Sequence, residues 1–392
     1  MIGNHKLIVD NFCEISQHLL YIADDTFYDF ASHEPVPGAI YVFSRQQIMA
    51  NVSGVKQLVE DNVIRVVLAN PAEGADTMFW QCKTAGLLEL VRERKILLVT
   101  GGLFHDANIP ALLYEHFLVQ IHNYQENHAA IKQYQAQSSL GRPHKFLFLN
   151  GRTRTHRKYL LERFRANGLL DQAIWTNLDP RTCVGFRYLE WYQHEDTSQP
   201  QHQPNLDFVQ HPFPVQALPP EYEVDRYRER STTTAPESSE DLYVKHHLFN
   251  REWGEVYLEP KCYLDTYFSL VTETTFDYPC SFRTEKIWKP IGIGHPWIAA
   301  ANAGYYKDMH NLGFKTFGHL IDESFDSIEN PQDRCARIGE VVEDLCSQDL
   351  DAFVVAAKSA CDHNQQLHHA LHHEYQRQFM PRFIQFVKEN FA

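Results

Sequence analysis

The chain has 392 residues, of which 44% are hydrophobic and 22% charged, a balance that excludes a disordered or fibrous protein. Its length exceeds what one hydrophobic core usually serves, so two domains are expected. Lys and Arg number 36 against 50 Asp and Glu, and the net charge of −14 excludes broad electrostatic binding to nucleic acid. An anionic ligand would need a local basic pocket.

The chain carries no recognisable targeting or membrane segment. Its first twenty residues lack the apolar core of a secretory signal, and no apolar run approaches the length of a membrane span. The eight cysteines are scattered without a Cys-x-x-Cys pair, which disfavours a zinc site or a disulfide scaffold. We therefore expect a cytoplasmic protein with no membrane span, although an effector exported without a cleaved signal would have the same features.

Residues 37–105 alternate short apolar runs with helical stretches. AIYVF (39–43), VIRVVLAN (63–70) and KILLVTGG (95–102) predict strands, and VSGVKQLVE and MFWQCKTAGLLELVRER between them predict helices. Strands that alternate with helices predict a parallel sheet with crossover helices. A first, Rossmann-like domain that binds an acceptor is expected over residues 1–140.

A second α/β unit begins at KFLFLNGRTRTHRKYLLERFRANGLL (145–170), where an apolar strand leads into a basic loop and a helix. Residues 195–241 are rich in Pro, Gln, His, Ser and Thr and predict a long irregular insertion. Regular elements then resume: the strand YFSLVTET (267–274), a helix from Thr284, the strand HPWIAA (295–300) and helices from Pro331 to Phe391. The second domain is expected over residues 141–375, with a last helix at 376–392 that packs on the first domain.

This order of elements predicts an α/β protein with two Rossmann-like domains facing across a cleft and with C-terminal helices. That is the GT-B architecture of glycosyltransferases, but periplasmic-type binding proteins and two-domain dehydrogenases share the outline. No Gly-x-Gly-x-x-Gly follows a strand and no phosphate-binding P-loop is present, which disfavours dinucleotide and P-loop chemistry.

The segment at 267–304 carries the most chemistry. A strand is followed by Glu273, then by Thr284-Glu285-Lys286 at the start of a helix, and then by a Gly-x-Pro turn into a strand. The carboxylate can accept hydrogen bonds from ribose hydroxyls, while the Lys and the helix amides can hold phosphates. The same three residues also fit an ordinary capping box.

This segment resembles the C-terminal domain of the α-1,3/α-1,4-fucosyltransferases, which carry Phe-x-Leu-x-x-Glu-Asn, Tyr-x-Thr-Glu-Lys-Leu and Gly-x-x-Pro-Val motifs. The matching residues are Phe268, Leu270, Glu273, Thr284, Glu285, Lys286, Ile287, Gly294, Pro296 and Trp297. Thr274 replaces the family's Asn, and Phe282 replaces its Tyr. The resemblance implies that Glu285 and Lys286 contact the ribose and diphosphate of a GDP-sugar such as GDP-fucose.

The segments 145–157 and 315–330 also resemble uncharacterised glycosyltransferase-like proteins of phages and bacteria. In the fucosyltransferases an Arg at the start of the helix after the basic loop binds the diphosphate, and Arg157 is the nearest match. Cations at a helix start oppose the helix dipole, so an anionic ligand would explain them, whereas the alternative is a solvated basic loop. The expected donor-binding residues are Asn150, Arg152, Arg154, Arg157, Glu273, Thr274, Phe282, Arg283, Thr284, Glu285 and Lys286.

An inverting transferase also needs a general base near the acceptor hydroxyl. Glu73 and Asp76 follow the strand VIRVVLAN, and His105 follows KILLVTGG, so these three are the candidates. Each of them is also a common turn residue.

A metal site is not expected. His368, His369, His372 and His373 are spaced for one helix face, and the acidic run from Asp322 to Asp326 fits a turn and helix cap. No Asp-x-Asp motif is present, so basic side chains would take the place of a metal ion.

The sequence therefore predicts an inverting, metal-independent glycosyltransferase with a nucleotide-sugar co-substrate, no other cofactor, and a glycan or protein acceptor. The alternatives are a non-catalytic nucleotide- or sugar-binding module on the same scaffold, with 195–241 as its partner-binding element, and an effector that glycosylates a host protein.

Overall fold

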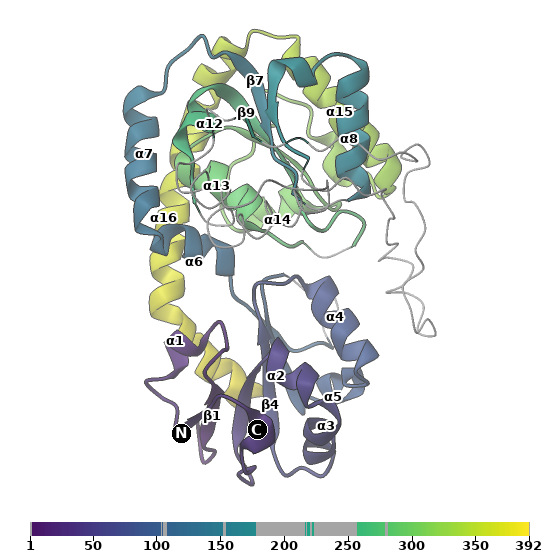
Figure 1. Ribbon diagram of the computed structural model, residues 1–392, viewed down its shortest axis with the longest axis vertical. Coiled ribbons are helices and arrows are strands. Elements are labelled where there is room, and N and C mark those ends of the chain that lie inside the picture. Colours follow the sequence, from purple (N-terminus) through teal and green to yellow (C-terminus); the bar gives the residue numbers. More distant parts are fainter. Residues whose placement is uncertain are drawn as a thin grey trace, which may run out of the picture. The chain divides into compact units, whose positions relative to one another are not determined.

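The computed structural model describes residues 2–102, 104, 108–151, 154–177, 216, 218–219, 222, 257–278 and 281–391 (Figure 1). Almost all of the predicted insertion at 195–241 lies outside these residues. The chain divides into two compact units, and neither is one continuous stretch. Unit 1 comprises Met1–Val119, Cys280–Arg283 and Leu371–Ala392, and unit 2 comprises Gln120–Pro279 and Thr284–Ala370.

Unit 1 contains a six-stranded parallel sheet in the order β2-β1-β3-β4-β5-β6. The central strands are buried along their length, as expected for a sheet covered on both faces. The strands are β1 (Leu7–Asp10), β2 (Asp25–Phe27), β3 (Ile40–Ser44), β4 (Arg65–Asn70), β5 (Ile96–Thr100) and β6 (Ala111–Leu113).

Short helices connect these strands: α1 (Ser16–Leu19), α2 (Arg45–Ala50), α3 (Val52–Glu60), α4 (Ala75–Thr84) and α5 (Leu88–Arg92). The stretch predicted as one helix after β4 forms two, α4 and α5. Gly86 lies between them with a φ of +65°, a left-handed conformation that ends a helix and suits glycine.

Unit 2 contains a four-stranded parallel sheet in the order β10-β9-β7-β8. Its strands are β7 (His144–Phe148), β8 (Ala173–Trp175), β9 (Thr266–Thr272) and β10 (Trp297–Ala300). Aromatic side chains join the central strands, since Phe146 and Phe268 stack with ring centroids 5.6 Å apart. The α/β class with parallel sheets is therefore confirmed.

The described α-helices of unit 2 are α6 (His116–Asn123, which begins in unit 1), α7 (Gln125–Gln137), α8 (Thr155–Ala166), α12 (Pro260–Leu264), α13 (Glu285–Ile293), α14 (Tyr305–Asn311), α15 (Pro331–Cys346) and the first half of α16 (Leu350–Asn390). Helices α8 and α15 lie side by side (Figure 1), joined by Arg163 Nε and Glu343 Oε1 at 2.6 Å. Of the described helices, none is long and apolar enough to cross a membrane.

The strand order of unit 2 creates a switch point between β7 and β9. The chain leaves β7 through α8 to reach β8 on one side, and leaves β9 through α13 to reach β10 on the other. At such a point the crossovers diverge and open a crevice outside the carboxyl ends of the strands, where open α/β sheets bind ligands. The amino ends of α8 and α13 follow these two strands, so the described donor-binding candidates of unit 2 lie at or near this edge of the sheet.

Candidate functional site

Glu273 comes directly after β9 and fixes the start of α13. It is fully buried, its Oε1 accepts from the amide of Thr284 at 3.0 Å, and its Oε2 accepts from the Thr284 hydroxyl at 2.6 Å. The Tyr305 hydroxyl donates to Oε1 at 3.1 Å. Burial raises the pKa of Glu273, although Lys286 and the bonds from Thr284 oppose this shift. In this arrangement the carboxylate is an internal anchor.

Thr284 is the N-cap of α13, because its hydroxyl accepts from the amide of Lys286 at 3.3 Å. The capping interpretation of Thr-Glu-Lys is therefore correct for Thr284. The next two side chains form an ion pair, Lys286 Nζ to Glu285 Oε1 at 2.6 Å, and remain 23% and 15% exposed. Burial raises the pKa of Glu285, but the charge and hydrogen bond of Lys286, together with Lys289 and a backbone hydrogen bond, outweigh it and lower the net pKa. This ionised pair stays within reach of a ligand.

Asn150 lies two residues beyond β7 and joins three strand ends. Its side-chain Oδ1 accepts from the Thr272 hydroxyl at 2.9 Å, and its backbone N–H donates to the Thr176 hydroxyl at 2.8 Å. The residue is 2% exposed, and its Nδ2 has no hydrogen-bond partner among the described residues. A buried donor without a partner costs about 1–3 kcal/mol, so this edge of the sheet has unused hydrogen-bonding capacity.

The start of α8 is basic and has no side-chain cap among the described residues. Arg154 stands at the N-cap position in extended backbone and is half-buried. Arg157 is buried, and its Nη2 donates to the carbonyl of Thr272 at 2.9 Å and that of Glu273 at 3.4 Å. Lys158 is also buried, with Nζ donating to Asn177 Oδ1 at 2.6 Å. The resemblance implied that Arg157 binds the diphosphate. In this structure its guanidinium donates to backbone carbonyls at the end of β9.

His156 packs beside these cations as a neutral ring. It stacks on Phe276 with centroids 4.5 Å apart, and its Nε2 donates to the carbonyl of Glu273 at 3.0 Å. Burial and the neighbouring Arg157 hold the pKa of His156 well below its usual value. The ring therefore adds no positive charge to the start of α8.

Two threonine hydroxyls extend the unused capacity at this edge. Thr155 begins α8 and Thr275 lies two residues after Glu273; both are buried, and neither Oγ1 has a partner among the described residues. Thr274 between Glu273 and Thr275 is half-buried. Neither Thr155 nor Thr275 is among the predicted donor-binding residues, because single threonines carry no pattern.

Phe282 and Arg283 belong to unit 1, although the next residue, Thr284, belongs to unit 2. Phe282 forms an isolated antiparallel bridge with Gly102, and its ring lies 6.3 Å from that of Phe117. Arg283 forms a buried ion pair with Glu115. Both predicted donor-binding residues thus have partners within unit 1.

Of the candidate bases, the structure describes Glu73, in the loop that follows β4, and the position of Asp76 in α4. Glu73 is partly exposed, with Oε1 3.7 Å from Nη1 of Arg45. Asp76 is the second residue of α4, and the side chain of Asp76 is not described. His105 lies outside the described residues, and so does Arg152, one of the predicted donor-binding residues.

A further carboxyl, Glu14, follows β1 and was not selected from the sequence. It is half-buried, and its Oε2 has no hydrogen-bond partner among the described residues. Burial, with a smaller effect of Glu73, raises the pKa of Glu14 to about 7, although the backbone of Ala72 and Arg45 oppose the shift. No motif marks Glu14, because its environment comes from residues far along the chain.

The histidines and acids considered as metal ligands contact other side chains and backbone amides. His368 packs against His122 and Trp288 in unit 2, whereas His372 and His373 belong to unit 1. Asp326 accepts from the amides of Tyr306 and Lys307, and Asp322 pairs with Arg337. Within the part of the chain that the structure describes, no group of three or more His, Cys, Asp or Glu is placed to hold a metal ion.

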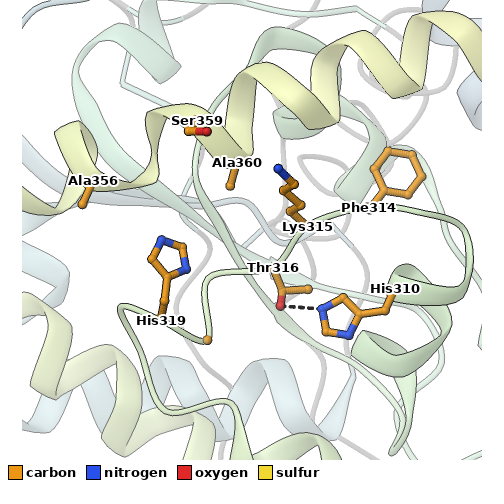
Figure 2. A pocket seen from close by; sticks show the side chains of 9 residues that line it. His310, Phe314, Lys315, Thr316, His319, Ala356, Ser359 and Ala360 are labelled. Atoms are coloured by element: carbon orange, nitrogen blue, oxygen red, sulfur yellow. Dashed lines mark hydrogen bonds between the residues drawn. The ribbon is translucent and has the colours of Figure 1, made fainter.

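Unit 2 also has a shallow hollow of about 420 Å³ beside the first half of α16 (Figure 2). Lys315, His319 and Ser359 border it, but all three side chains are exposed. Its buried polar residue, Thr316, accepts from His310 Nε2 at 2.8 Å and donates to Glu323 at 2.7 Å. The hydroxyl of Thr316 is thus committed to protein partners.

Among the described residues, the β7/β9 edge therefore combines a helix start without a side-chain cap, cationic side chains and three buried polar atoms without hydrogen-bond partners. These are features that bind a phosphorylated, hydroxyl-rich ligand. Comparison of the chain with protein-family models, curated proteins and solved structures gave no match.

Proposed function

We propose that the protein transfers a glycosyl group from a nucleoside-diphosphate sugar to an acceptor hydroxyl, with inversion and without a metal ion. On this proposal the two units are the two Rossmann-like domains of a GT-B enzyme. The observation that carries it is the β7/β9 switch point. There the start of α8 has no side-chain cap among the described residues, and it lies beside Asn150 Nδ2 and Thr155 Oγ1, two buried atoms with no hydrogen-bond partner among those residues.

A nucleoside diphosphate suits this edge for electrostatic reasons. Backbone amides at the start of α8 can donate to phosphate oxygens, and Arg154 and Lys286 are partly exposed cations on the two helices. Arg157 and Lys158 are buried cations of the same helix, and the low dielectric constant around them strengthens their electrostatic attraction for a phosphate. Such fixed charges stabilise a leaving diphosphate as its negative charge develops.

Glu285 supports the sugar-nucleotide part of the proposal. It is ionised and partly exposed beside Lys286, so its oxygens can accept from ribose hydroxyls. In the transfer, the acceptor oxygen bonds to the anomeric carbon, the bond to the diphosphate breaks, and the acceptor proton passes to a base. Glu73, Asp76 and His105 stay candidates for that base.

The test is a thermal-shift series with GDP, UDP, ADP, CMP and their sugar conjugates, each with and without EDTA. A ligand at 100 times its dissociation constant should stabilise the chain by about 2.7 kcal/mol. Lys286→Ala should abolish the shift, whereas Lys307→Ala, which removes an exposed Lys of α14, should preserve it. No shift with any nucleotide, or one that requires Mn²⁺ or Mg²⁺, would contradict the proposal.

A second candidate is a non-catalytic nucleotide- or sugar-binding module. It is favoured by the commitment of Glu273 to Thr284 and Tyr305, and of Arg157 to backbone carbonyls. Nucleotide binding without release of the diphosphate from any sugar conjugate, in the presence of acceptor glycans, would select this candidate.

A further inference from the structure

The carboxyl edge of the unit 1 sheet carries an exposed aromatic pair. Phe12, after β1, is 60% exposed and Tyr28, after β2, is 67% exposed. Their ring centroids lie 5.6 Å apart with an interplanar angle of 68°. Large apolar rings left in water are costly unless a ligand covers them, so this pair calls for an explanation.

The backbone under both rings is held firmly. The amide of Phe12 donates to Asp10 Oδ1 at 2.9 Å, and Gln47 Nε2 donates to the carbonyl of Tyr28 at 2.6 Å. Between them, the amide and Nδ2 of Asn11 both donate to the carbonyl of Phe27, at 2.9 and 3.2 Å. The backbone that carries the two rings is therefore held in place, which reduces the entropy lost when a ligand stacks on them.

Polar groups continue the same edge. The strands lie in the order β2-β1-β3-β4. Tyr28 follows β2, Phe12 and Glu14 follow β1, and Arg45 follows β3. Asn70 is the last residue of β4, and Glu73 comes three residues later. Strands are about 4.8 Å apart, so these four strand ends span about 14 Å. The row thus changes from aromatic to charged along a length suited to an extended ligand.

Two buried atoms in the charged half indicate what the ligand offers. Asn70 is 4% exposed, and its Nδ2 has no partner among the described residues, as is the case for Glu14 Oε2. A hydroxyl can accept from an amide and donate to a carboxyl, so it satisfies both kinds of atom. Arg45 and Glu73, with side chains 49% and 37% exposed, can likewise donate to and accept from hydroxyls.

We propose that this row, Phe12, Tyr28, Glu14, Arg45, Asn70 and Glu73, is a carbohydrate-binding site. The aromatic faces pack on the C–H face of a sugar ring, and the polar groups bind hydroxyls of the same ligand. Its role as the site of the glycosyl acceptor rests on the proposed function, whereas carbohydrate binding itself does not.

The test uses the full chain on an array of immobilised neutral oligosaccharides, followed by titration of the best-bound sugar in solution. Phe12→Ala and Tyr28→Ala should each weaken binding about tenfold, since loss of one ring removes one stacking contact. The matched control is Tyr21→Ala, which removes a 91% exposed ring of the same unit from outside the row. The three variants should have the same melting temperature as the wild type.

Three results would overturn the proposal: no oligosaccharide bound by the wild type, binding unchanged in Phe12→Ala and Tyr28→Ala, or an equal loss in Tyr21→Ala. The thermal-shift series with nucleotides is independent of this outcome, because its variant, Lys286→Ala, lies in unit 2. Sugar binding without any nucleotide effect would therefore reject the transferase and keep this site.

Discussion

Arg283 and Glu115 form a fully buried ion pair within unit 1, although 168 positions separate them in the chain. Nε of Arg283 donates to Glu115 Oε1 at 2.8 Å, Nη2 makes a second contact with the same oxygen, and the side chains are 0% and 2% exposed. The pair anchors the short segment 281–283 to unit 1, immediately before the Thr284 cap of unit 2.

Removing one partner of this pair should be strongly destabilising. Glu115→Ala leaves the Arg283 guanidinium buried without its carboxylate, and such changes cost about 3–5 kcal/mol. The double variant Glu115→Leu with Arg283→Met should recover much of the loss, because no uncompensated charge remains. Urea unfolding of the single and double variants measures this; equal stability of Glu115→Ala and wild type would show that the pair contributes nothing.

Thr284→Ala should destabilise unit 2 by about 2–3 kcal/mol. The change removes the N-cap of α13, worth about 1 kcal/mol, and leaves a buried oxygen of Glu273 without its donor. Thr284→Ser keeps the hydroxyl and should recover most of the stability. Chemical denaturation of the three proteins is the measurement, and a Ser variant as unstable as the Ala variant would assign the effect to the lost methyl group.

Glu285→Ala and Lys286→Ala should weaken nucleoside-diphosphate binding more than they weaken the fold. A hydrogen bond to a charged group contributes about 1.5–3 kcal/mol to binding, whereas a partly exposed ion pair contributes about 0–1 kcal/mol to stability. Calorimetric titration and thermal melts of each variant separate the two quantities. Variants that melt much lower yet bind normally would restrict this pair to a structural role.

Arg157→Ala should lower turnover about 10²-fold and ground-state binding less, if its charge stabilises the leaving diphosphate. Arg157→Lys should recover part of the loss, because Lys keeps the charge but not the planar fork that reaches the carbonyls of Thr272 and Glu273. Release of nucleoside diphosphate from its sugar conjugate is the assay. Arg163→Ala on the same helix is the control, since Arg163 pairs with Glu343 of α15.

The contribution of Glu14 to the stability of the chain should decrease as pH rises from 4.5 to about 7, and the difference between wild type and Glu14→Gln isolates it from the buried histidines. Its pKa is raised from 4.5 to about 7, so the folded state holds a proton that the unfolded state has released. At about 1.4 kcal/mol per pKa unit, and with an allowance for its partial exposure, the loss is about 2–3 kcal/mol above pH 7. Glu14→Gln should be more stable than wild type at pH 8 and nearly equal at pH 4.5. Parallel pH profiles for the two proteins would show that Glu14 does not titrate abnormally.

The long apolar runs allowed much of the fold to be predicted. VIRVVLAN became β4, YFSLVTET became β9 and VSGVKQLVE became α3, because each pattern is set by residues next to one another in the chain. The strands β1 and β2 were not predicted, since runs of four and three residues are too short to show a period. The pairing of β1 with β3, and of β2 with β1, is decided by contacts across the sheet.

The candidate site was predictable only where a motif carried it. Thr284, Glu285 and Lys286 follow a recognisable order, and the structure places Thr284 as the predicted cap. The partners of Arg157 and Arg283 depend on residues more than a hundred positions away, so no local pattern reveals them. Glu14, Phe12 and Tyr28 were missed for the same reason, because their environment is made by several strand ends together.

Helix α16 limits how the protein can be divided. Its residues up to Ala370 belong to unit 2 and those from Leu371 to unit 1, where Phe379 packs on Tyr114 with ring centroids 4.8 Å apart. A gene fragment ending at residue 119 would therefore produce a unit 1 sheet without the α16 aromatic residues that pack on it. Cleavage at one position in the chain would not separate unit 1 from unit 2 with either unit complete. Because neither unit is one continuous segment of the gene, a single recombination event could not exchange one unit alone. Unit 1 and unit 2 are therefore expected to have been inherited together.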